Sequence, residues 1–161
     1  MSARPDSAVQ EAIDKMTIGE MQSRYMFALD WHDPEMYASL FTDDAVLEWP
    51  EGQAKGREQI YNACVRIGEF YDNLAAAAAP RKPFQLRHFV TNRAFDIKGD
   101  QARAWAYWLD LNNDNLQRWP YVAAYGYYED DLVRTADGWR FTHRKIFNEM
   151  TGESPRDNPV T

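Results

Sequence analysis

Apolar residues in the first third of the chain recur every three or four positions, as they do along one face of a helix. In "TIGEMQSRYMFALDWH", residues 17–32, these positions are Ile18, Met21, Tyr25, Met26 and Leu29. Thr17, followed three residues later by Glu20, has the spacing of a capping box. The pattern therefore predicts a first helix that begins at Thr17 and ends near His32.

Two further helices are predicted downstream. In "HDPEMYASLF", Asp33 is suited to cap a helix and Pro34 to occupy its first position, where a missing N–H costs nothing. A third helix is expected from Arg57 to about Leu74. The low-complexity stretch "AAAAAP", residues 75–80, either extends this helix up to Pro80 or forms a lid-like connection, and we interpret it as a mobile cover.

Apolar and polar residues alternate, as in β-strands, in residues 45–49 and again after Pro83. "AVLEW", residues 45–49, predicts a short edge strand, and the turn-forming "PEGQAKG" after it predicts a loop. After Pro83 come four long β-rich segments, "FQLRHFVTNRAFDIK", "QARAWAYWLDLNN", "YVAAYGYYEDDLVRT" and "WRFTHRKIFNEM". Helices followed by an antiparallel meander indicate the α+β class. We expect one domain over 1–161, with its core at about 15–150 and with frayed polar ends at 1–12 and 152–161.

The composition of the chain is consistent with an apolar pocket and argues against nucleic acid and membranes as partners. A chain of 161 residues can bury a core and keep a cavity, and 14% aromatic residues suit an apolar one. The net charge of -7 and the lack of a basic stripe give the phosphate backbone of a nucleic acid no electrostatic attraction to the protein. No apolar run is long enough for a membrane helix or a signal peptide, so the expected location is the cytoplasm.

The inventory of reactive motifs is short. The single cysteine, Cys64, lies in the helical pattern "IYNACVRIGEFY" and is interpreted as a buried, inert thiol. The three histidines lack the spacing of a metal site, and neither a phosphate-binding glycine loop nor a serine elbow occurs. If the protein is an enzyme, we expect it to need no cofactor and no metal.

Several words of the sequence resemble a known family. "RYMFALDWHDPEMYASLFTDDAVLEWPEG", then "GREQI", and finally "LVRTADGWRF" are similar to the SnoaL-like branch of the nuclear-transport-factor-like superfamily, over roughly residues 15–150. The resemblance implies a cone-shaped fold, in which about three N-terminal helices pack on a highly curved antiparallel or mixed sheet and enclose a pocket. It is specific for the fold and uninformative about the reaction, because this fold hosts several enzyme classes and non-catalytic subunits.

The resemblance also implies a pair of catalytic residues. Asp30, at the end of the first predicted helix, and His88, in "LRHFVTN", stand where scytalone dehydratase and hexachlorocyclohexane dehydrochlorinase keep an Asp–His dyad. An imidazole can accept a proton near neutral pH, and a carboxylate on its other nitrogen fixes the tautomer. The resemblance thus assigns His88 as the base and Asp30 as the residue that orients it.

Other pocket residues follow from the same overlay. Tyr25, in "RYMFAL", falls where ketosteroid isomerases carry an oxyanion-binding tyrosine, whereas the isomerase's general base would fall on Trp49. In scytalone dehydratase the position of Trp49 is a tyrosine that contacts the substrate, and a second histidine of that enzyme would fall near Asn112. The chain therefore departs from both enzymes at these two positions. Tyr25 and Asp30 are five residues apart, roughly 140° around a helix, so both reach one cavity only if it wraps around the helix end.

Strand alternation extends the candidate site. His88, Val90 and Asn92 are expected on one face of their strand. On the next strand the inward set is Ala104, Ala106, Trp108, Asp110 and Asn112, and the outward set is Trp105, Tyr107 and Leu109. Together with Tyr128, this predicts a substrate-binding lining of Tyr25, Trp49, Asn92, Trp108, Asn112 and Tyr128.

The two remaining histidines are given structural roles. His32 adjoins the predicted cap of the second helix, which favours a surface or capping position. His143, in "FTHRKIF", either lines the far end of the pocket or pairs with Asp130 or Asp131. Outward aromatic residues, among them Phe89, indicate that the convex sheet face is covered in a homo-oligomer, a dimer or a trimer.

The residues and the resemblance together favour a cofactor-independent lyase acting on a small aromatic or hydrophobic compound. The expected step is proton abstraction by His88 followed by loss of water or another small fragment such as formaldehyde, as suits aromatic catabolism. One alternative is a polyketide-type cyclase or isomerase in which Asp30 is the base. The other is a binding or scaffold subunit without catalysis.

Overall fold

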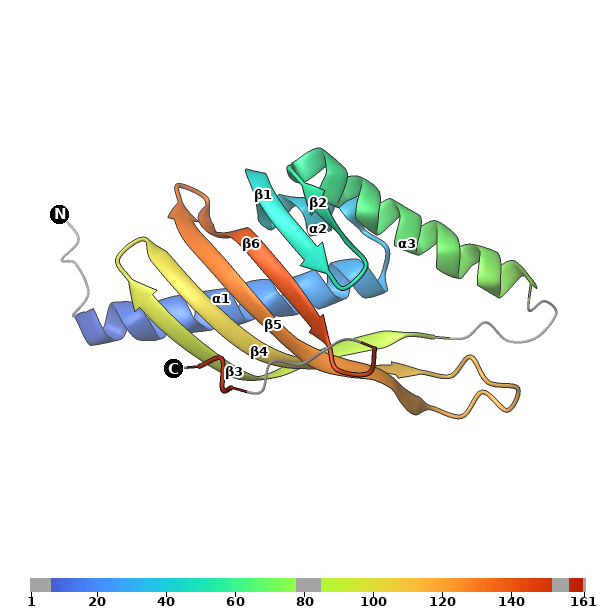
Figure 1. The fold of residues 1–161 in the computed structure, drawn as a ribbon. Coiled ribbons are helices and arrows are strands. Elements are labelled where there is room, and N and C mark those ends of the chain that lie inside the picture. The colour runs from blue at the N-terminus through green and yellow to red at the C-terminus, as the bar shows by residue number, and fades with distance from the viewer. Residues whose placement is uncertain (1–6, 78–84, 152–156, 161) are drawn as a thin grey trace.

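The computed structural model describes residues 7–77, 85–151 and 157–160, which form three helices and one six-stranded sheet (Figure 1). The helices are α1 (Ser7–Asp30), α2 (Pro34–Ser39) and α3 (Arg57–Ala77). The strands are β1 (Phe41–Trp49), β2 (Gly52–Lys55), β3 (Arg87–Lys98), β4 (Gln101–Asn112), β5 (Tyr121–Thr135) and β6 (Gly138–Asn148). The predicted α+β class, with helices first and a meander after them, is confirmed.

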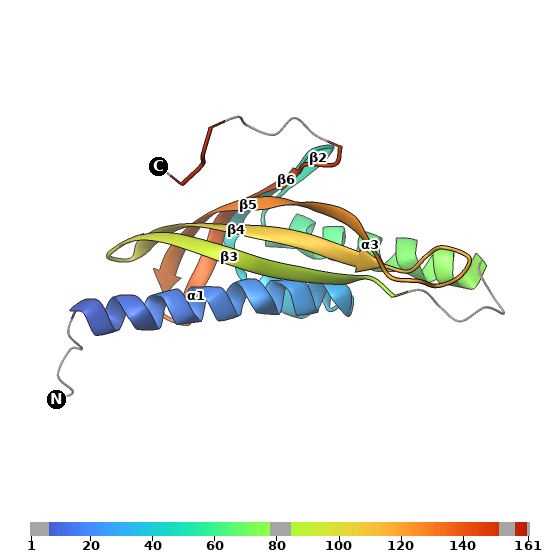
Figure 2. The ribbon, with the colours of Figure 1, turned by 90° about the horizontal axis from the view of Figure 1, so that it is seen from below.

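The sheet is mixed and curved, with the strand order β2-β1-β6-β5-β4-β3. Only β1 and β6 run parallel, and every other neighbouring pair is antiparallel. Figures 1 and 2 show α1 extended along the β3 side of the meander and α3 over the β1–β2 hairpin. The space between α1, α3 and the sheet is where the site described below forms.

The first helix is longer than the sequence pattern predicts. It begins at Ser7, and the Thr17 hydroxyl donates to the Ile13 and Asp14 carbonyls inside the helix, so the predicted capping box is wrong. The added turns are held by tertiary contacts, because the buried Asp14 carboxylate accepts two hydrogen bonds from Arg134, at 2.8 and 2.7 Å. Residues 7–12, which we expected to be frayed, are therefore helical.

The strand prediction also needs correction at the sheet edge. Residues 45–49 belong to the longer β1, which pairs with β2 on one side and β6 on the other. Part of the predicted loop, residues 52–55, is the true edge strand β2. The prediction missed it because four residues centred on one buried alanine, Ala54, show too little alternation.

The junction between the first two helices turns sharply at residues 28–33. The Asp33 N–H donates to the Ala28 carbonyl at 2.8 Å and the His32 N–H donates to the Leu29 carbonyl, which is the hydrogen-bond pattern of a Schellman motif. His32 has the left-handed φ of 51° that this motif requires. The Asp33 side chain then accepts the Met36 N–H at 2.9 Å, so its predicted role as the cap of α2 is confirmed. Asp30 is consequently held at the very end of α1.

The core beneath the helices contains an ion pair among aromatic rings. Arg144 donates to Asp130 through two hydrogen bonds of 2.7 Å, and both side chains are fully buried. The guanidinium lies 4.1 Å from the Tyr25 ring centre, 4.3 Å from that of Tyr128 and 4.1 Å from that of Phe141. This cluster holds the ring of Tyr25, which lines the larger cavity, and the ring of Tyr128 behind it.

Three further predictions concern single segments. Cys64 is buried as expected, and burial raises the pKa of its thiol to about 11, which keeps it protonated. Helix α3 begins at Arg57 as predicted and continues to Ala77, while the rest of the expected mobile cover lies outside the described residues. No helix in the described ranges has the length and the apolar character needed to cross a membrane.

Candidate active site

Two adjoining cavities lie between α1, α3 and the sheet. The larger measures about 430 Å³, within the usual range of small-molecule sites, and the smaller about 170 Å³. They share the lining residues Leu29, Ile67, Tyr71, Leu86 and His88. The larger cavity is mostly apolar, whereas the smaller one contains two carboxylates, Asp30 and Asp72. His88 lies where the two meet, so a ligand in either cavity contacts it.

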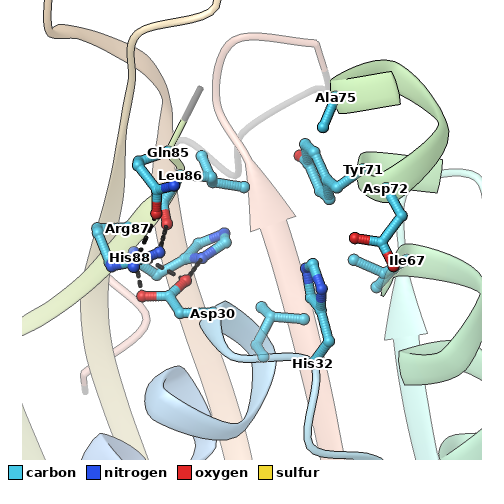
Figure 3. Close-up of a pocket in the computed structure, with 11 residues that line it drawn as sticks. Asp30, His32, Ile67, Tyr71, Asp72, Ala75, Gln85, Leu86, Arg87 and His88 are labelled. Carbon is cyan, nitrogen blue, oxygen red and sulfur yellow. Dashed lines mark hydrogen bonds and ion pairs between the residues drawn. The ribbon is translucent and has the colours of Figure 1, made fainter. Parts of the chain in front are cut away.

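Asp30 and His88, 58 residues apart in the chain, meet at the junction (Figure 3). The His88 ring Nδ1 lies 2.6 Å from Asp30 Oδ1, and the His88 backbone N–H donates to Oδ2 at 2.9 Å and to Oδ1 at 3.2 Å. An ionised carboxylate has no hydrogen to give, so Nδ1 carries the ring proton and donates it. The ring's Nε2 is then the basic nitrogen, and Figure 3 shows the ring pointing into the cavity.

A second carboxylate lies on the other side of the imidazole. Asp110 Oδ2 is 3.9 Å from His88 Nε2, beyond hydrogen-bond distance but close enough for a charge effect. Asp110 faces the same side of the sheet because it is paired with His88 across β3 and β4. Burial raises the pKa of Asp110, although hydrogen bonds from the Ala124 and Ala123 backbone oppose the rise. An imidazolium formed at His88 would thus lie between two acidic groups.

Two tyrosine residues with hydrogen-bonded hydroxyls contribute to the wall of the larger cavity. Tyr25 OH and Tyr37 OH are 2.6 Å apart, and both residues line the cavity wall. Burial raises the pKa of Tyr25 and, more strongly, that of Tyr37, so both keep their protons. One hydroxyl donates to the other, and the second hydrogen remains to be donated to a ligand oxygen. Tyr25 thus occupies the cavity position predicted for it.

The other predicted binding residues divide by position. Trp49 lines the larger cavity. Trp108 and Tyr128 are buried behind it: their rings stack on each other, and Trp108 lies 6.5 Å from the His88 ring between centroids. The Trp108 indole donates to the Phe147 carbonyl, and the Tyr128 hydroxyl faces Met26 Sδ at 4.0 Å. These two residues pack against the site and do not form its surface.

The structure does not bring Asn92 to the cavity. A bulge between Thr91 and Ala94 interrupts the alternation of β3, and Asn92 adopts a left-handed φ of 49° with an exposed side chain. Arg93 instead points toward α1, where it donates to Gln22 at 3.0 Å. The predicted continuation of the His88 face therefore stops at Val90.

Asn112 also lies outside both cavity walls. Its side-chain oxygen accepts the backbone N–H groups of Asn113 at 2.7 Å and Asp114 at 3.1 Å, which makes it the cap of the turn after β4. The expected inward set of β4 holds for Ala104 and Trp108, which belong to the core. A register shift next to Asp110 then breaks the pattern before it reaches Asn112.

The remaining histidines are also located. His32 lines the smaller cavity, with its ring stacked on Tyr71 at 6.1 Å between centroids, so it is not simply a surface residue. His143 lines neither cavity, and its ring nitrogens lie 3.4 Å from Glu48 and 3.9 Å from Asp131. Within the described residues, no group of three His, Cys, Asp or Glu side chains could hold a metal ion.

Several lining residues were not predicted as site residues. Helix α3 contributes Ala63, Arg66, Ile67, Phe70 and Tyr71 to the larger cavity. Their spacing of three and four residues is the signal that would have identified this face of the helix. Tyr37, in α2, lacked such a signal because a six-residue helix shows too little periodicity.

The family follows from comparison with known proteins. Residues 10–145 match the model of the SnoaL-like domain, which covers most of the chain. The chain belongs to the SnoaL-like family. Comparison with curated proteins gives no match.

Solved structures give the same fold. A structure from Catenulispora acidiphila in complex with S-DNPA is 31% identical, with a TM-score of 0.66, over 85% of this chain and 92% of that one. A putative scytalone dehydratase from Novosphingobium aromaticivorans is 22% identical, with a TM-score of 0.72, over 95% of this chain and 97% of that one. LinA is 18% identical, with a TM-score of 0.73, over 89% of this chain and 91% of that one. SnoaL-like proteins of this fold include enzymes that modify small molecules.

Proposed function

We propose that this SnoaL-like protein is a cofactor-independent lyase that eliminates water, or a related small fragment, from a small aromatic or hydrophobic compound. The observation that carries the proposal is the 2.6 Å contact between His88 Nδ1 and Asp30, with Nε2 left facing an apolar cavity of about 430 Å³. A basic nitrogen beside an apolar chamber suits proton transfer to and from a bound organic molecule.

The elimination can be written with these groups alone. His88 Nε2 takes a proton from the carbon next to a carbonyl, and the electron pair of that C–H bond moves toward the carbonyl oxygen. The free hydroxyl hydrogen of the Tyr25–Tyr37 pair donates to that oxygen as its charge develops. The β-hydroxyl then leaves with its bonding pair and takes the proton back from His88, which releases water and restores the neutral imidazole.

The same groups can support loss of formaldehyde. His88 would then take the proton of a primary hydroxyl group, and the C–C bond next to it would break as the C=O bond of formaldehyde forms. The electron pair of the broken bond forms a C=C bond and expels hydroxide from the neighbouring carbon. The hydroxide takes the proton back from His88, so formaldehyde and water are released and the neutral imidazole is restored. In both reactions Asp30 stabilises the transient imidazolium and keeps Nε2 turned to the substrate.

The geometry favours His88 over Asp30 as the base. Both Asp30 oxygens already accept hydrogen bonds from His88, one of them from the ring and the backbone together. A cyclase or isomerase that used Asp30 as its base would have to break these bonds before the carboxylate could take a proton. A non-catalytic subunit has no evident use for a paired imidazole, only 13% exposed, at a cavity wall.

The test is turnover of a panel of aromatic β-hydroxy ketones and arylpropane diols, followed by the absorbance of the conjugated product. We expect His88→Gln to lower kcat about 10²–10⁴-fold, the usual contribution of general acid–base catalysis. Asp30→Asn should lower it less, because the imidazole remains. His143→Gln is the matched control, since that histidine lines neither cavity, and it should leave kcat unchanged.

Two results would contradict the proposal. One is a kcat in His88→Gln equal to that of the unmodified protein, combined with a rate that shows no ionisation between pH 5 and 8. The other is loss of activity in Asp30→Asn with full activity in His88→Gln, which would make Asp30 the base and favour the cyclase or isomerase alternative.

A further inference from the structure

Among the residues that the structure describes, the larger cavity has one charged wall residue other than His88. Its lining is otherwise made of aliphatic and aromatic side chains, with the Tyr25–Tyr37 hydroxyls at one end, and Arg66 of α3 is part of the wall. Arg66 lies four residues before Phe70 and three after Ala63, so it belongs to the stripe of α3 that faces the chamber. The proposed reaction of the Asp30–His88 dyad and the Tyr25–Tyr37 pair assigns no role to this guanidinium.

Arg66 differs from the other arginines near the site in having no partner among the described residues. Arg57 pairs with Asp43 at 3.0 Å, Arg144 is bound by Asp130, and Arg87 donates to Gln85 and lies over the Trp31 ring. Within the ranges 7–77, 85–151 and 157–160, no hydrogen bond or ion pair forms at Arg66. Its side chain is exposed to solvent at the cavity and is available to a ligand.

The charges around the two cavities restrict where an anionic group could bind. The described lining of the smaller cavity has two carboxylates, Asp30 and Asp72, against one arginine, Arg87, whose guanidinium already donates to the Leu86 carbonyl and to Gln85. The protein as a whole has a net charge of -7, so that end of the site and most of the surface disfavour an anion. Arg66 offers the opposite charge and a planar fork of N–H donors that matches a carboxylate. A ligand with a carboxylate is therefore oriented, with its charged end at Arg66 and its neutral end toward His88.

We propose that the substrate is an aromatic carboxylic acid, bound as its carboxylate by Arg66 at the cavity wall. The proposal rests on the proposed function only in taking the larger cavity as the substrate site. The carboxylate is the end of the substrate that binds and does not react. The ring system fills the apolar chamber, and the reacting carbon and oxygen lie between His88 and the tyrosine pair.

Calorimetric titration of the full chain with matched pairs of ligands tests this proposal. The probes are benzoate, 2-naphthoate and biphenyl-4-carboxylate, each compared with its primary amide, which has nearly the same shape without the charge. We expect at least one carboxylate to bind about fivefold more tightly than its amide, which corresponds to ~1 kcal/mol. The preference should weaken as NaCl is raised from about 0.05 to 0.5 M, because the cavity is open to solvent.

Variants separate Arg66 from general charge effects. Arg66→Gln should bring the carboxylate and amide affinities to within about twofold of each other without weakening the amide, and Arg66→Lys should retain part of the preference. Arg24→Gln is the matched control, because Arg24 is an exposed α1 arginine whose partner is Glu20 and which lines neither cavity. It removes the same charge and should leave the preference unchanged.

The proposal is overturned if no carboxylate of the panel binds more tightly than its amide, including the case in which none binds. It is also overturned if Arg66→Gln keeps the full preference. His88→Gln distinguishes this from a failure of the proposed function. If that variant keeps both turnover and the carboxylate preference, the dyad mechanism fails while the Arg66 site stands. If it loses turnover while Arg66→Gln changes no affinity, the reverse holds.

Discussion

The buried ion pair between Arg144 and Asp130 offers the sharpest test of how this core is held together. Arg144→Met keeps an unbranched side chain of similar length and removes the guanidinium. The Asp130 carboxylate then loses two hydrogen bonds of 2.7 Å and keeps one from Gln22, at 3.0 Å. Because it is fully buried, water cannot replace what is lost.

Removing one partner of a buried pair typically costs about 3–5 kcal/mol, since the other charge is left uncompensated. A domain of this size unfolds with about 5–15 kcal/mol, so the change is a large part of its stability. At about 2–4 °C per kcal/mol, the melting temperature should fall by about 6–20 °C. Urea unfolding followed by tryptophan fluorescence measures the loss of free energy, and a thermal melt at the same protein concentration measures the melting temperature.

A second variant isolates the stranded charge as the cause. Asp130→Leu combined with Arg144→Met removes both charges, and we expect it to recover most of the lost free energy, leaving a deficit of ~1 kcal/mol because Gln22 loses its acceptor. The reasoning is refuted if Arg144→Met costs under about 1 kcal/mol, or if the double variant is no more stable than the single one.

Three further predictions concern the sheet. Burial raises the pKa of Asp110 in the folded state above its unfolded value, so ionisation of this carboxyl opposes folding. Asp110→Asn should therefore raise the free energy of unfolding at pH 7. The gain should disappear when unfolding is measured below about pH 4, where the carboxyl is protonated in both states. A Cβ on Gly126 would lie 1.8 Å from the Phe147 carbonyl oxygen, so Gly126→Ala should cost about 3 kcal/mol in a thermal melt, and a neutral effect would contradict the close approach of β5 and β6. We also propose that Phe89 and Tyr107, which are 48% and 54% exposed, are covered in a homo-oligomer. Light scattering should give the unmodified protein the mass of a dimer or trimer and a lower mass when both residues are replaced with Glu, and a monomeric mass for the unmodified protein would contradict the proposal.

Much of the fold was predictable because periodicity alone defines the elements. The alternation after Pro83 gave four strands in the right order, and Asp33 with Pro34 identified the start of α2. The start of α1 was missed because the Thr17–Glu20 spacing also occurs inside helices. What extends the helix to Ser7 includes a contact between Asp14 and Arg134, 120 residues away, which no local pattern contains.

The candidate site was less predictable, and the reason differs from residue to residue. Asp30 and His88 were paired through the family resemblance, since nothing local connects positions 58 residues apart. Asn92 was misplaced because a single bulge reverses every later side chain on the strand. Arg66 was overlooked because the pattern of a helix shows which face is apolar, whereas the extent of the cavity decides which polar residue borders it.

The double attachment of His88 to Asp30 has a consequence for how such a protein can change over time. The same carboxylate holds both the ring and the backbone N–H of His88, so it joins the end of α1 to the beginning of β3 as well as orienting the imidazole. Substitution of Asp30 would therefore disturb both this connection and the proposed chemistry. The cavity walls that α3 and β1 supply do not take part in this connection, so mutations there could change which ligands fit while the proposed Asp30–His88 pair is kept.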